Sequence, residues 1–93
     1  MSTRFTKASL LLLLEGDEAL YQRLREASLL PEREEEIAAQ HAEIARVAHT
    51  LVRELEVNVE GVEIVLRMRS ELIASRQQVA DLLRLLAERT GGR

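Results

Sequence analysis

The spacing of apolar residues along the chain predicts helices throughout. No run alternates between apolar and polar residues, and only one proline and four glycines interrupt the 93 residues, so β-structure is not expected. Two short helices come first, over residues 7–14 and 18–27, with Thr6 and Asp17 as their N-caps. Only Glu15–Gly16–Asp17 separates them, which is typical of a helix-turn-helix.

Two longer helices are expected to follow, one over residues 32–55 after Pro31 and one from the N-cap Asn58 to about residue 88. The third helix has an apolar stripe in steps of four and three: Ile37, His41, Ile44, Ala48, Leu51 and Leu55. We therefore predict an all-α single domain over residues 1–93. In it a helix-turn-helix-like part, 6–30, packs on a long helical hairpin, 32–89, made of an antiparallel pair of helices.

The second half of the fourth helix carries a heptad pattern. At about 1.5 Å per residue this helix is roughly 45 Å long, so a small domain cannot cover all of it. An a/d seam of this kind favours pairing with a second copy, although a helix packed on its own domain can show the same spacing. Glu71 and Arg76 would flank the seam at g and e positions. We predict a homodimer with a seam of Val65, Met68, Leu72, Val79, Leu82 and Leu86.

Composition excludes several kinds of site. The chain has no cysteine, and therefore no disulfide or zinc–thiolate site, and its single Phe and Tyr make base stacking improbable. No glycine-rich phosphate loop is present, and His41 and His49 lie two helical turns apart, too far to share a metal. We expect no enzyme, no cofactor and no metal. The longest apolar run, residues 8–14, is too short to cross a membrane, and we expect a cytoplasmic protein.

Acidic residues concentrate directly after Pro31. The formal net charge is −3, and residues 32–61 hold eight acidic and three basic side chains. A helix dipole favours carboxylates in a first turn, so a solvated helix start explains the run Glu32 to Glu36. A docking surface for a basic partner is the alternative, and both interpretations can hold together.

Two stretches resemble the MerR superfamily. Residues 5–31 resemble its N-terminal helix-turn-helix, with Phe5–Thr6 at the start and Ser28–Leu29–Leu30–Pro31 at the end. Residues 51–72, LVRELEVNVEGVEIVLRMRSEL, resemble the family's next unit, in which a turn leads into a long helix. The segment from Asn58 is similar, more specifically, to MerR-like chaperone modulators of the CbpM type.

The resemblance implies two classes of function. MerR regulators bind DNA as dimers through the second helix and a β-wing. CbpM-type modulators bind the J-domain of a DnaJ-type co-chaperone and block its work with DnaK, while the related factor DafA holds DnaK and DnaJ together. No wing follows Pro31 here, Gln22 and Arg23 replace the Arg-aromatic pair of DNA-binding members, and the acid run would repel phosphate.

We therefore predict a chaperone modulator that binds the J-domain of a DnaJ- or CbpA-type co-chaperone, with DnaK as a further partner in an assembly. A MerR-like regulator that binds DNA through Arg23 and Arg25, and a helical dimer with an unknown protein partner, are the alternatives. The predicted partner-binding residues are Tyr21, Arg25, Leu29, Glu32, Glu34, Glu35 and Glu36.

Overall fold

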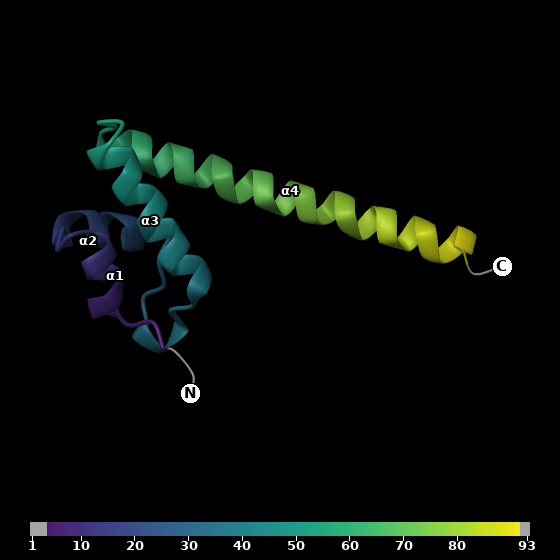
Figure 1. The fold of residues 1–93 in the computed structure, drawn as a ribbon, viewed down its shortest axis with the longest axis horizontal. Coiled ribbons are helices and arrows are strands. Elements are labelled where there is room, and N and C mark those ends of the chain that lie inside the picture. Colours follow the sequence, from purple (N-terminus) through teal and green to yellow (C-terminus); the bar gives the residue numbers. More distant parts are fainter. Residues whose placement is uncertain (1–3, 92–93) are drawn as a thin grey trace.

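A computed structural model describes residues 4–91, which form helices joined by short turns (Figure 1). The elements are α1 (Lys7–Leu13), α2 (Glu18–Glu26), the single 3₁₀ turn η1 (Glu34–Glu36), α3 (Ala39–Arg53) and α4 (Val59–Gly91). The described part of the chain contains no strand, so the predicted all-α class with four helices is confirmed. The predicted domain limits, 1 and 93, lie outside the described residues.

Both short helices begin at the residues that the sequence predicts. The Thr6 hydroxyl accepts a hydrogen bond from the Ser9 amide at 3.1 Å, and the Asp17 carboxylate accepts one from the Leu20 amide at 3.0 Å. Each cap satisfies an amide that the first helical turn leaves without a carbonyl partner. The N-cap predictions are therefore confirmed, and each helix ends one residue earlier than expected.

Both short helices end in left-handed turns that sequence patterns do not favour. Glu15, just after α1, has φ 55°, and Ser28, just after α2, has φ 64°. In each case the next amide donates back across the helix end, as in the Leu29 amide to the Leu24 carbonyl at 2.9 Å. This Schellman arrangement closes the helix and folds the following residue back onto it, which places Leu29 in the core.

The core lies where α1 packs on α3 and α2 packs on the first turns of α4. The buried residues of α3 are alanines, and their small side chains allow α1 to approach closely. The face of α3 that enters the core is therefore rotated relative to the predicted stripe. Ile44 and Leu51 lie at the edge of the core, and Leu55 lies beyond the helix end and is exposed. The buried side chains are Leu10, Leu14, Leu20, Tyr21, Leu24, Leu29, Leu30, Ile37, Ala42, Ala45, Ala48, Val62 and Leu66.

The third helix begins at Ala39, and the predicted start at residue 32 is wrong. In a continuous helix, glutamates three and four residues apart would repel one another, which disfavours a helix through this run. Ile37 instead takes extended backbone and inserts into the core. At the true helix start the Ala38 amide donates to Nδ1 of His41 at 2.9 Å, so this histidine acts as a cap.

The fourth helix leaves the domain after its first two turns. Asn58 caps it as predicted, accepting from the Gly61 amide at 2.8 Å. Val62 and Leu66 are the α4 residues that reach the core, and every residue from 70 to 80 is exposed. Figure 1 shows α3 and α4 diverging from their shared turn, so the expected hairpin is closed only near that turn. A 15-residue α3 is too short to accompany a 33-residue α4.

Candidate functional site

The first candidate surface is the acidic segment between α2 and α3. Its four glutamates, Glu32, Glu34, Glu35 and Glu36, are all exposed, and we call this segment the acidic face. Glu34 accepts a hydrogen bond from the backbone amide of Lys7 at 3.3 Å, which links the acidic face to the start of α1. Arg33 pairs with Glu35 at 2.8 Å, whereas Glu32 and Glu36 extend into solvent.

Among the described residues, Glu32 and Glu36 have no hydrogen-bond or ionic partner, so half of the carboxylates on the acidic face are free to meet a partner. A hydrogen bond from its own backbone amide, followed by the bond from Arg33, holds the pKa of Glu35 below its ordinary value. Because the segment forms a 3₁₀ turn separated from α3, the expected stabilisation by the dipole of a following helix does not explain it. The interpretation as a docking surface therefore gains support relative to a solvated helix start.

The acidic face borders a hollow of mixed character that sequence reasoning missed. The hollow has a volume of about 320 Å³, and Phe5 and Ile37 line it together with the charged residues Arg4, Glu34 and Glu35. Phe5 lies in the segment before α1 and Ile37 in the segment before α3, so the two are far apart in sequence. Only the folded chain places an aromatic side chain beside the acid run, and no sequence spacing could have indicated it.

Two of the predicted partner-binding residues are wrongly placed on the surface. Tyr21 is only 4% exposed and Leu29 only 9%, because both pack into the core where α2 meets α1. Burial raises the pKa of the Tyr21 hydroxyl, and Lys7 Nζ lies 5.4 Å from its ring centroid. Arg25 is half-buried and donates to Gln22 at 2.7 Å. The predicted patch therefore loses Tyr21 and Leu29 and keeps Arg25 and its acidic residues.

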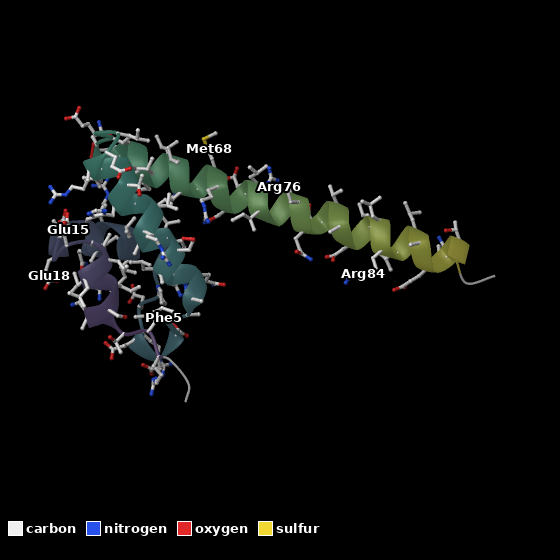
Figure 2. The ribbon with its side chains drawn as sticks, viewed as in Figure 1. Phe5, Glu15, Glu18, Met68, Arg76 and Arg84 are labelled. Carbon is white, nitrogen blue, oxygen red and sulfur yellow. The ribbon has the colours of Figure 1, made fainter. Side chains whose placement is uncertain are left out.

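The predicted dimer seam is a continuous exposed stripe along α4. Met68 is 63% exposed, and in Figure 2 it projects from the side of α4 opposite α3, while Arg84 projects toward the other side. The buried residues Val62 and Leu66 and the seam lie about 130° apart around the helix, at 100° per residue. The seam therefore faces away from the domain. Its members Val65, Met68, Leu72, Val79, Leu82 and Leu86 are all exposed.

Arg23, the candidate DNA contact, is already paired within the chain. Its guanidinium lies 3.3 Å from Glu63 and 3.9 Å from Glu60, both on α4. These contacts join the second helix of the helix-turn-helix to the base of α4. An arginine that two carboxylates hold against the protein is poorly placed to contact a phosphate.

A charged cluster joins the α1–α2 turn to α3, and no sequence pattern indicates it. The Glu15 carboxylate accepts from Nε2 of His49 at 2.8 Å and from the Arg53 guanidinium at 2.7 Å. The bond from His49, and then that from Arg53, lower the pKa of Glu15. Its position explains why Glu15 accepts a left-handed backbone, and we regard the cluster as structural. The described residues contain no grouping of side chains suited to a metal ion.

Comparison with known proteins adds no information on these surfaces. No family model, curated protein or solved structure matches the chain. No helix within residues 4–91 combines the length and apolar character needed to span a membrane. The functional conclusion therefore depends on the acidic face, the hollow beside it and the seam on α4.

Proposed function

We propose that the protein is a chaperone modulator, a non-catalytic helical protein that binds the J-domain of a DnaJ-type co-chaperone through its acidic face. The observation that carries the proposal is the exposure of Glu32, Glu34, Glu35 and Glu36 beside a hollow that Phe5 helps to line. Carboxylates steer a basic partner and fix its orientation, while an aromatic side chain such as Phe5 supplies apolar contact that charge alone does not provide.

The choice of a J-domain rests on the resemblance to CbpM-type modulators. J-domains present a basic helix beside their His-Pro-Asp loop, and that helix is the chemical complement of an acidic face. A modulator on this surface would control access of DnaK to the co-chaperone without any bond chemistry. DNA binding has less support, because Arg23 is held by Glu60 and Glu63 and the neighbouring surface is acidic.

The proposal includes pairing of two chains along α4. The seam leaves six large apolar side chains exposed on one helix face, and a monomer gains nothing from that exposure. A second copy carries the matching stripe and requires no further partner. A dimer would present two acidic faces and could bind two J-domains.

Calorimetric titration with the J-domain of a DnaJ-type protein from the same organism tests the proposal. The parent is expected to bind saturably and more weakly at high salt. The double variant Glu34→Lys and Glu35→Lys is expected to lose about tenfold or more in affinity. The lost Lys7–Glu34 hydrogen bond should cost less than about 1 kcal/mol of stability, which a thermal melt verifies.

A matched control separates the acidic face from overall charge. Glu54 and Glu56 are exposed glutamates in the α3–α4 turn, so Glu54→Lys with Glu56→Lys changes the net charge equally. The control is expected to retain most of the affinity. Absence of binding by the parent, or equal affinities for the two double variants, would contradict the proposal. ATPase assays with DnaK would then distinguish an inhibitor from an assembly factor.

A further inference from the structure

The α4 seam has a direction, which follows from the positions of its charged neighbours. With Val65 at an a position, Glu71 falls at g and Arg76 at e, on either side of the seam. The ion pairs along α4 join Arg67 to Glu63 and Arg84 to Asp81. Among the described residues they leave Glu71 and Arg76 without an ionic partner, although both side chains are exposed beside the apolar stripe.

A parallel, in-register pair satisfies these charges. In parallel coiled coils a g residue lies beside the e residue five positions later on the other helix. Glu71 of each copy would then meet Arg76 of the other, which gives two attractive contacts per dimer. Every seam residue would meet its own counterpart, including Val65 at the end nearest the domain. Valine at a with leucine at d, as at Val79 and Leu82, favours two parallel strands.

An antiparallel pair fits less well. Two antiparallel registers align four apolar layers each, one with Leu72 opposite Leu82 of the second copy and one with Val65 opposite Leu82. Because e positions then flank e positions, Arg76 would lie close to Arg76 of the second copy in the first register and close to its Arg69 in the second. The parallel pair aligns six apolar layers, so either antiparallel register loses two of them. Repulsion and the lost layers both disfavour an antiparallel pair.

We propose that a second copy of this chain pairs with α4 in parallel and in register. The inference rests on the α4 pairing of the proposed function and adds its geometry. The domain does not obstruct the arrangement, because Met68 projects from the side of α4 opposite α3 (Figure 2). Both domains, and hence both acidic faces, then lie at the same end of the paired helices. Two J-domains would be bound side by side at that end.

Single-cysteine crosslinking tests the direction, since the chain contains no cysteine of its own. In the parallel pair, Leu86→Cys and Met68→Cys each meet their own counterpart and crosslink with themselves under mild oxidation. In either antiparallel register each would lie at least about 16 Å from its counterpart along the helix, too far for a disulfide. In the register with Leu72 opposite Leu82, a mixture of the two variants would give only Met68-to-Leu86 crosslinks. Arg84→Cys, on the side of α4 away from the seam, is the control and should not crosslink.

The outcomes distinguish the direction from the pairing itself. Self-crosslinking of both seam variants supports the parallel pair, and a dimer in which neither variant crosslinks with itself overturns it, whether or not the mixture crosslinks. Absence of any crosslink, with a monomer in sedimentation, would refute the pairing and leave J-domain binding by the acidic face as a separate question. As a second measurement, Arg76→Gln should weaken a parallel dimer by about two- to fivefold. A tighter Arg76→Gln dimer would indicate relief of repulsion and contradict the parallel arrangement.

Discussion

The substitution Leu72→Glu is expected to convert the dimer into a monomer. Leu72 lies in the middle of the seam and is 52% exposed in the single chain. Complete burial of a leucine side chain is worth about 1.5–3 kcal/mol, so its exposed half contributes about 1 kcal/mol in each copy. Truncation to alanine in both copies therefore weakens the dimer by about 2 kcal/mol, or roughly 30-fold. Glutamate adds two buried carboxylates facing each other, which raises the loss beyond about a hundredfold.

Sedimentation equilibrium measures this change, and far-UV circular dichroism establishes that the variant still folds. Leu12→Glu is the matched control, because Leu12 is exposed on α1 and lies outside the seam. The control should dimerise like the parent. A parent that is monomeric at every accessible concentration, or a Leu72→Glu variant that associates as tightly as the parent, would refute the reasoning.

Two further predictions concern the folded domain. Burial lowers the pKa of His41, and its Nδ1 accepts a hydrogen bond that only the neutral ring can accept. The stability that the neutral ring contributes is present above the ordinary pKa of histidine and is lost as pH falls through the lowered pKa. His41→Gln can still cap the helix but does not titrate, so between about pH 7 and pH 5 its melting temperature should fall less than that of the parent. Equal falls in melting temperature would contradict the role of His41 as a cap. Ser28→Gly should raise stability in urea unfolding by about 0.5 kcal/mol, because φ is 64° there, and a lower midpoint would show that the turn is unstrained.

Local signals in the sequence were sufficient for the starts of α1, α2 and α4. Thr6, Asp17 and Asn58 each cap a helix through an amide three residues later, and that interaction involves one turn of chain. The seam on α4 was also predictable as a pattern, since heptad spacing describes one helix face whatever it contacts. The structure adds that the described part of the chain leaves this face of α4 uncovered.

The sequence could not supply features that depend on tertiary contacts. The start of α3 at Ala39 depends on Ile37 entering the core, and helix propensity alone favours an earlier start. Tyr21 was placed on the surface because a tyrosine among charged residues gives no indication of its burial. The Glu15–His49–Arg53 cluster and the hollow beside Phe5 join residues more than 25 positions apart, which no spacing rule detects.

Residue-resolved NMR of the ¹⁵N-labelled protein, titrated with unlabelled J-domain, tests the central claim most directly. The proposed function predicts that amide signals from residues 32–38, together with Phe5 at the edge of the hollow, shift first and by the largest amounts. Signals from residues 70–80 of α4, which extend away from the domain, should stay in place. Shifts centred on α4, or a spectrum unchanged at saturating J-domain, would contradict the assignment of the acidic face as the binding surface.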